Sequence, residues 1–191
     1  GAVRDNGKGI SGVAPRVGLA GYNLIVTDAQ GNSSLINTAN KVTAMSRNIA
    51  DVWVFNNSWG SPDSSGAVQP AEQAFLDAIE SGLSKGRNGL GAIYMWAAGN
   101  GHYTTSPAGA PTKISVPVDN ANLDEGVNFH GVLTVGAVNA LGTKAGYSEE
   151  GSCLLVCAPS GGGEFTYTGT GVVNDAPITG LVPVSYTHLT L

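Results

Sequence analysis

Two short polar turns stand out in the sequence because each follows directly after an apolar run. The run Val52–Phe55 leads into Asn56-Asn57-Ser58-Trp59-Gly60, and the run 92–98 leads into Gly99-Asn100-Gly101. If both runs are neighbouring parallel strands, the two turns meet at the carboxyl edge of one sheet, where such sheets bind their ligands. The carboxamide of Asn100 could then donate a hydrogen bond to an oxyanion that develops during acyl transfer. From the spacing alone, the simpler explanation is an asparagine in the left-handed backbone of a strand-exit turn.

A glycine-rich stretch near the beginning of the chain offers a different chemistry. Gly7-Lys8-Gly9-Ile10-Ser11-Gly12 matches the pattern of a dinucleotide-binding turn. That site needs a strand before the glycines and a helix after them, but no strand pattern precedes the stretch, and Pro15 interrupts the segment where the helix should form. We therefore interpret the stretch as a turn and keep a dinucleotide-binding domain as the competing hypothesis, which NAD binding would test.

The elements that must carry these turns alternate between strand and helix. Apolar residues step by three and four from Leu35 to Ile49, which predicts a helix, and a second helix is expected to open at Pro70 and end near Gly86. The continuous run Val52–Phe55 is typical of a central strand covered on both faces. This alternation predicts an α/β fold with three layers, a doubly wound and mostly parallel sheet. The predicted strands are 16–26, 52–55, 92–98, 132–138 and 154–158.

Composition narrows the function classes. The chain has 191 residues, which fits one domain, and its formal net charge is −5, so no basic field is present to hold a nucleic-acid backbone. No apolar run approaches the roughly 20 residues that a membrane-spanning helix needs. Glycine makes up 28 residues and charged residues only 12%, which is typical of chains with many tight turns and closely approaching backbones.

Six sequence blocks together resemble the subtilase family of serine endopeptidases. They occur in the order and spacing of that family and extend to about residue 163. The runs Ser58-Trp59-Gly60 and Lys85-Gly-Arg-Asn-Gly-Leu-Gly-Ala-Ile-Tyr94 are similar to the kexin and furin-like branch. The six blocks are Gly12-Val-Ala-Pro15, Asn57-Ser-Trp-Gly60, Trp96-Ala-Ala-Gly-Asn-Gly101, Val132-Leu-Thr-Val-Gly-Ala137, Tyr147-Ser148 and Ala158-Pro159.

The resemblance implies a role for individual residues of the peptide site. Asn100 matches the oxyanion-hole asparagine of the family. Ser58, Trp59 and Gly60 match the segment whose main chain pairs with an extended substrate, and Ala97 belongs to the matching substrate-binding segment next to Asn100. Asp63 and Asp124 match two aspartates that face a basic P1 side chain in the furin-like branch, and a carboxylate pair suits Arg or Lys.

The resemblance also implies calcium as the cofactor. Asp63, Asp119 and Glu149 match the calcium ligands beneath the P1 pocket of the branch, and three hard carboxylates suit this ion. Asn6 matches a second calcium loop, together with the carbonyl groups around Val3, Lys8 and Ile10. Without the resemblance, each of these acids would be interpreted as an ordinary solvated loop carboxylate.

The sequence also departs from the family at several positions. Lys41 and Val68 stand where furin-like proteases carry acids that favour a distant basic substrate residue, so a multibasic preference is not expected. Asp124 is followed by Glu125-Gly126 where the branch has the glycine at once, which leaves the register of this loop open.

The catalytic Asp, His and Ser of the family are not found in the sequence. Their HGT and GTS-A blocks are absent, and His102, His130 and His188 are interpreted as surface or loop residues. We expect residues 1–181 to be an internal part of a subtilase catalytic domain, truncated at both ends. Residues 182–191 stop resembling the family and are expected to be a non-native tail.

The combined hypothesis is a fragment of a calcium-dependent serine endopeptidase that acts on peptide or protein substrates, with cleavage after Arg or Lys as the narrower expectation. We expect the whole protein to be a secreted or otherwise extracytoplasmic monomer, with no nucleic-acid partner. The alternative is a catalytically inactive pseudo-protease that binds peptides. An HGT block upstream and a GTS-A block downstream in the full reading frame would favour the enzyme.

Overall fold

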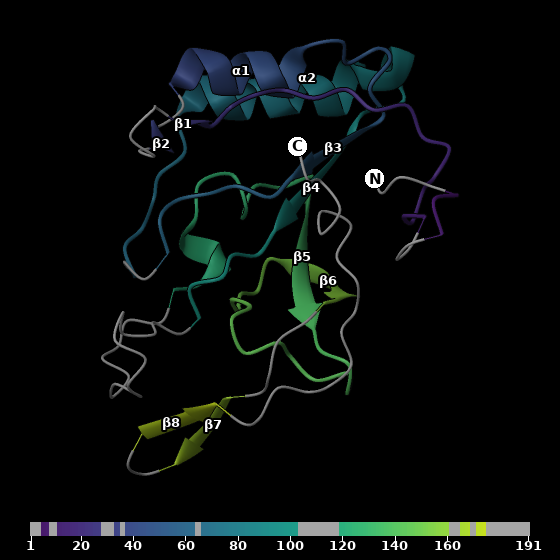
Figure 1. Cartoon of the computed structure of the whole chain (residues 1–191). Coiled ribbons are helices and arrows are strands. Elements are labelled where there is room, and N and C mark those ends of the chain that lie inside the picture. The colour runs from purple at the N-terminus through teal and green to yellow at the C-terminus, as the bar shows by residue number, and fades with distance from the viewer. Residues whose placement is uncertain are drawn as a thin grey trace.

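The centre of the fold is a four-stranded parallel sheet. The computed structural model describes residues 5–7, 11–27, 33–34, 37–63, 66–102, 119–160, 165–168 and 171–174. The strands lie in the order β3-β4-β5-β6 (Figure 1), and the register pairs Val54 with Ile93 and Tyr94 with Val132. Their bounds are β3 Val54–Asn57, β4 Ile93–Ala97, β5 Val132–Val138 and β6 Leu154–Pro159. The predicted parallel α/β architecture is therefore confirmed.

Two helices, α1 (Thr38–Ser46) and α2 (Gln73–Gly89), pack against each other as one layer beside the sheet (Figure 1). The side chain of Asn37 caps α1 by accepting a 2.9 Å hydrogen bond from the main-chain N–H of Asn40. Near its end α2 is kinked, and Arg87 adopts a left-handed backbone with φ of 52°. The sequence pattern placed the first turn of α2 three residues too early, because Glu72 is its N-cap and Pro70 lies before the helix.

The core lies between this helix layer and one face of the sheet. Alternation along the strands turns Phe55, Tyr94 and Trp96 toward the helices, and all three are buried. The rings of Phe55 and Tyr94 stack with centroids 4.7 Å apart. The Tyr94 hydroxyl donates a 2.6 Å hydrogen bond to the carbonyl of Met45, which ties β4 to α1.

Two strand predictions were wrong. Residues 16–25 form no strand; only β1 (Val26–Thr27) pairs, antiparallel with β2 (Ser33–Ser34). A β-rich composition does not make a strand without a partner that accepts its main-chain hydrogen bonds. The run 52–55 does contribute to a parallel strand, β3, but not to a central strand covered on both faces: β3 ends the strand order of the described sheet, and Val54 is 48% exposed.

A short antiparallel hairpin, β7 (Phe165–Thr168) and β8 (Gly171–Asn174), was not predicted, and Ala121–Leu123 forms a 3₁₀ turn, η1. Residues 182–191, expected to be a non-native tail, lie outside the described residues. Within the described segments, neither α-helix combines the length and the apolar composition that membrane crossing requires.

Candidate active-site cleft

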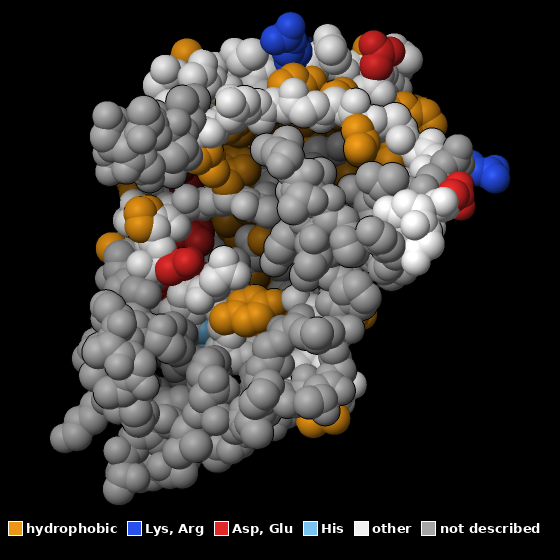
Figure 2. Space-filling model, in the orientation of Figure 1, with side chains coloured by type: hydrophobic (Ala, Val, Ile, Leu, Met, Phe, Trp, Pro, Cys, Tyr) orange, Lys and Arg blue, Asp and Glu red, His pale blue; other side chains and the backbone are white. Residues whose placement is uncertain are grey.

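The exits of β3 and β4 meet at one cavity of about 360 Å³, which we call the cleft. Every residue predicted for the oxyanion hole and for substrate binding contributes to its lining. On the face shown in Figure 2, basic side chains lie at the margins, whereas acidic side chains lie both at the margins and, with hydrophobic side chains, nearer the middle. The lining residues are Ser58, Trp59, Gly60, Ser61, Asp63, Ala97, Ala98, Gly99, Asn100, Asp124, Val127, Val135, Ala137, Tyr147, Ser148 and Ser160.

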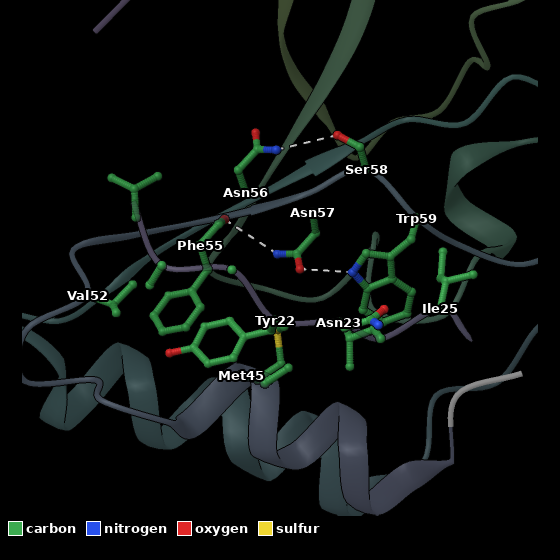
Figure 3. Close-up of a pocket in the computed structure, with 15 residues that line it drawn as sticks. Tyr22, Asn23, Ile25, Met45, Val52, Phe55, Asn56, Asn57, Ser58 and Trp59 are labelled. Atoms are coloured by element: carbon green, nitrogen blue, oxygen red, sulfur yellow. Dashed lines mark hydrogen bonds between the residues drawn. The ribbon is translucent and has the colours of Figure 1, made fainter. Parts of the chain in front are cut away.

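A second cavity, of about 410 Å³, lies between residues 20–25 and β3 (Figure 3). Its lining comes from apolar side chains, small residues, two asparagines of β3 and one of the 20–25 segment. Among the described residues, no carboxylate, imidazole, ammonium or guanidinium group lines it. Asp63, Asn100 and Asp124, which the sequence predicts for binding and catalysis, therefore line the cleft and not this larger second cavity.

Asn100 reaches the cleft because it lies in the turn that follows β4. Its side chain is exposed, and its main-chain N–H donates a 3.4 Å hydrogen bond to Asp63 Oδ1. Gly99, just before it, has φ of 111°, a conformation that favours glycine. The turn thus places the Asn100 carboxamide, which has no hydrogen-bond partner among the described residues, at the same cavity as the Ser58–Gly60 segment.

Three carboxylates gather beneath the cleft. One oxygen atom each from Asp63, Asp119 and Glu149 lies within 4.8 Å of the other two, although the three residues come from different loops. The N–H of Gly101 donates a 3.0 Å hydrogen bond to Glu149 Oε1, and the N–H of Gly66 donates to Asp119 Oδ1. These contacts draw the loops together around the carboxylates.

The carboxylate of Glu149 is buried, and its Oε2 atom accepts no hydrogen bond from the described residues. Burial, opposed by the Gly101 hydrogen bond and reinforced by the neighbouring aspartates, raises the pKa of Glu149 to about 7. A Cβ atom at Gly99 would overlap this carboxylate, so only glycine fits there. An oxygen set with an unsatisfied buried member is the chemistry that a hard divalent cation such as Ca²⁺ requires.

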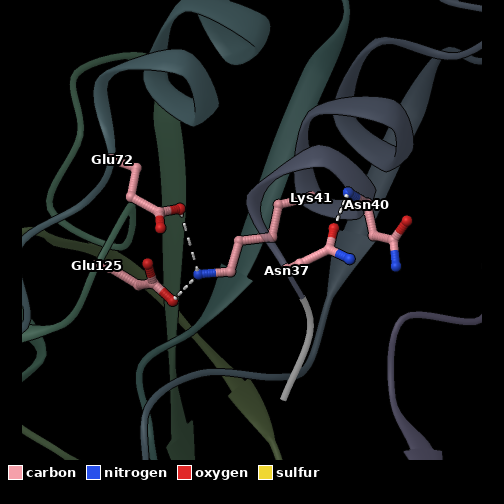
Figure 4. Close-up of polar contacts among 5 residues, drawn as sticks. All are labelled: Asn37, Asn40, Lys41, Glu72 and Glu125. Carbon is pink, nitrogen blue, oxygen red and sulfur yellow. Dashed lines mark hydrogen bonds and ion pairs between the residues drawn. The ribbon is translucent and has the colours of Figure 1, made fainter. Parts of the chain in front are cut away.

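Asp124 faces the cleft, and the residue after it does not. Burial is the main cause that raises the pKa of Asp124 to about 6, and neighbouring carboxylates add to the effect. Glu125 turns instead to Lys41 of α1, where the carboxylate Oε1 lies 2.5 Å from the ammonium (Figure 4). Glu72 lies 4.0 Å from the same ammonium. Glu125 therefore forms an ion pair with α1 and does not contribute to the cleft lining.

Tyr147, Ser148 and Ser160 also line the cleft. The sequence patterns assigned no site role to these three residues. The hydroxyls of Tyr147 and Ser160 form a 2.6 Å hydrogen bond, and Ser148 Oγ accepts a 3.0 Å bond from the N–H of Ala137. The signal available was their position after β5 and β6, whose carboxyl ends meet the same edge of the sheet.

Two further predictions for the beginning of the chain have a mixed outcome. Asn6 is exposed, while Val3, Lys8 and Ile10 lie outside the described residues, so the second calcium loop stays a prediction. The dinucleotide hypothesis is not supported, because residues 11–25 form turns and extended chain where that site needs a helix.

The histidines occupy different environments. His130 is exposed, as expected, and pairs with Glu80 at 3.0 Å. His102 lies in a loop, in agreement with the expectation of a surface or loop residue, but it is buried and not at the surface. Its backbone is drawn inward by a hydrogen bond from its N–H to the Tyr147 carbonyl. His188 lies outside the described residues.

Comparison with known protein families finds one match that covers most of the chain. The model of the subtilase family, a family of S8 peptidases, matches residues 1–180. The relatives include kexin- and furin-like processing enzymes. A dibasic-processing endoprotease of Schizosaccharomyces pombe is 31% identical over 156 residues, which is 81% of this chain and 19% of the relative. Neuroendocrine convertase 2 of Caenorhabditis elegans is 29% identical over 88% of this chain and 23% of the relative.

Bacterial proteases are similar as well. The Aeromonas extracellular serine protease of Aeromonas sobria is 34% identical over 189 residues, which covers 92% of this chain and 28% of the relative. A crystal structure of the serine protease of Aeromonas sobria aligns with a TM-score of 0.46 and 30% identity over 60% of this chain and 20% of that chain. The chain thus spans between 19% and 28% of the length of these three relatives.

Proposed function

The chain belongs to the subtilase family, and we propose that it forms the substrate cleft of a serine endopeptidase of the kexin- and furin-like branch. One observation carries the proposal. The predicted peptide-binding segment Ser58–Gly60 and the carboxamide of Asn100 line the same cleft, although they follow different strands. An extended peptide and an oxyanion donor are the two things that this class of reaction has to bring together.

In the proposed reaction the main chain of Ser58–Gly60 pairs with an extended substrate as an added strand. This pairing holds the scissile carbonyl next to Asn100. The Asn100 side-chain N–H then donates to the carbonyl oxygen as negative charge develops on it, an interaction stronger in the transition state than in the ground state. The nucleophilic serine, the histidine that takes its proton and the aspartate that orients the histidine come from other parts of the protein.

Asp63 and Asp124 give the cleft its preference for a positive side chain. Both line it, and neither forms an ion pair with a Lys or Arg among the described residues. A guanidinium or ammonium group from the substrate would supply the missing positive charge. The proposed cleavage position is therefore after Arg or Lys.

Calcium is the proposed cofactor, held by Asp63, Asp119 and Glu149. The ion would offset the mutual repulsion of the three carboxylates and fix the loops that carry them. Support comes from the spacing of the carboxylate oxygens and from the unsatisfied Oε2 of Glu149. Asn6 is proposed as a ligand of a second ion.

For its location we propose an extracytoplasmic protein that acts as a monomer on peptides or proteins. The support is the name of one relative, an extracellular serine protease, and the acidic net charge, which disfavours a nucleic-acid partner.

The test is hydrolysis by the longer protein that carries this chain. Matched peptides with Arg, Lys or Leu at P1 are assayed, and a serine-directed covalent inhibitor reports the nucleophile. The proposal expects cleavage after Arg and Lys together with stoichiometric labelling. Peptide binding without hydrolysis or labelling would instead favour the pseudo-protease alternative, and absence of both binding and cleavage would overturn the proposal.

A further inference from the structure

Trp59, at the centre of the peptide-binding segment, is held from two sides. The indole N–H of Trp96 donates a 2.7 Å hydrogen bond to the main-chain carbonyl of Trp59. The indole N–H of Trp59 in turn donates a 3.1 Å bond to Oδ1 of Asn57. Both the main chain and the side chain of Trp59 are therefore fixed by side chains from the ends of β4 and β3.

Asn57 is built into both strands. It is buried, and its Nδ2 lies within hydrogen-bond distance of the carbonyls of Phe55, at 3.4 Å, and Met95, at 3.3 Å. Figure 3 shows the carboxamide between Phe55 and the Trp59 indole, with its two ends turned toward different partners. Only a side chain with a donor and an acceptor at this place can serve both, which a buried leucine or carboxylate cannot.

Ring packing holds the same residues. The rings of Trp59 and Trp96 meet edge to face with centroids 4.7 Å apart, and the ring of Phe75 from α2 meets that of Trp96 at 5.9 Å. Phe75 also lies against Gly126, where a Cβ atom would come within 2.7 Å of the Phe75 ring. The two walls of the cleft, one carrying Ser58–Gly60 and one carrying Asp124, thus rest on one aromatic cluster.

The hydrogen bond from Trp96 has a directional consequence for the segment. In an extended chain, successive main-chain carbonyls point to opposite sides. The carbonyl of Trp59 is turned inward to the Trp96 indole, so in an extended segment those of Ser58 and Gly60 would point outward. The exposure agrees with this alternation, since Ser58 and Gly60 are exposed and Trp59 is half-buried between them.

We propose that Trp96 and Asn57 are positioning residues that set the register of the peptide-binding segment, because they fix the main chain and the side chain of Trp59. This inference rests on the proposed function, because it assigns the register of that same cleft. Neither residue contacts the substrate. Their effect is on how well an extended peptide pairs, and it should grow with the length of substrate on the N-terminal side of the scissile bond.

The test compares Trp96→Phe with Tyr94→Phe in the longer protein. Both variants remove one buried donor of β4 to a main-chain carbonyl, but the Tyr94 hydroxyl serves Met45 in the helix layer and not the segment. We expect Trp96→Phe to raise KM for a hexapeptide roughly five- to tenfold, the effect of losing about one hydrogen bond, and to leave kcat unchanged. A single-residue ester, which does not reach the segment, should keep its KM, and Tyr94→Phe should change neither substrate.

Two further measurements separate register from folding and from the proposed function. Replacing the Trp96 indole by benzothiophene, which has the same shape and no N–H, should reproduce the KM effect without a cavity. Hydrogen exchange without substrate should show the amides of residues 58–60 exchanging at least fivefold faster in Trp96→Phe than in Tyr94→Phe. Equal losses for hexapeptide and ester, or unchanged exchange at 58–60, overturn the inference. Faster amide exchange at residues 58–60 in a protein that hydrolyses no peptide would support the positioning role of Trp96 and would refute the proposed protease function.

Discussion

The main-chain N–H of Gly101 donates a 3.0 Å hydrogen bond to Glu149 Oε1, so the residue after Asn100 is tied to the innermost carboxylate of the acidic cluster. The N–H of Asn100 itself donates to Asp63 Oδ1 at 3.4 Å. The turn that carries the proposed oxyanion donor is therefore fixed by two of the three proposed calcium ligands. Substitutions in the acidic cluster should therefore lower catalysis by displacing the turn that carries Asn100.

Calcium removal should destabilise the protein. At a calcium concentration a hundredfold above Kd, chelation should remove about 3 kcal/mol of stability, which corresponds to a fall in Tm of about 5–10 °C. Glu149→Gln should abolish most of this calcium dependence in scanning calorimetry. Glu150→Gln is the matched control, because its side chain is 61% exposed and lies outside the cluster. Equal Tm with and without chelator would contradict the proposed metal site.

Asn100→Ala should lower kcat roughly 10²- to 10³-fold with little change in KM, because the lost hydrogen bond forms fully only in the transition state. Steady-state kinetics on an Arg peptide measures this. Asn56→Ala removes an exposed carboxamide at the neighbouring strand, outside the cleft lining, and should leave kcat unchanged. A loss confined to KM in Asn100→Ala would assign Asn100 to substrate binding instead.

Cleavage after Arg should fall as the pH decreases through about 6, because the pKa of Asp124 is raised to about 6 by burial and neighbouring carboxylates. Protonation below that pH removes the charge that attracts the P1 side chain. The ratio of kcat/KM for an Arg peptide to that for a matched Leu peptide cancels the titration of the catalytic histidine. Asp124→Asn should give a low ratio that no longer varies between pH 5 and 8, and a ratio that still falls would place the titrating group elsewhere.

Lys41→Met should destabilise the protein by about 3 kcal/mol, because it leaves the carboxylate of Glu125 largely buried without its partner. Urea denaturation of the single variants and of Lys41→Met with Glu125→Leu gives the coupling between the two. Glu72→Gln is the control and should cost less than about 1 kcal/mol, since Glu72 is 50% exposed and 4.0 Å from the ammonium. Additive losses at Lys41 and Glu125 would mean that the pair does not hold the loop.

The hydrophobic pattern correctly predicted the strands that bury one face and pair with neighbouring strands. The strand at 132–138 appears with its predicted bounds, and the strands at 92–98 and 154–158 differ by one residue at each affected end. These segments have both an apolar period and neighbouring strands to pair with. The segment 16–25 has a similar composition but pairs with no strand among the described residues, so its prediction as a strand failed. Composition reports propensity, whereas strand formation also needs a paired neighbour.

Residue types and block order in the sequence determined the family, the parallel α/β architecture and the gathering of Ser58, Trp59, Gly60 and Asn100 at one cavity, to which the family resemblance added Asp63. They could do so because turns after parallel strands necessarily gather at one edge of the sheet. The tertiary structure alone decided that Glu125 turns to Lys41, that Glu149 is buried with one unsatisfied oxygen, and that Trp96 holds the carbonyl of Trp59. Each of these depends on where side chains from separate loops meet and on how much water their packing excludes, and neither quantity is encoded in local spacing.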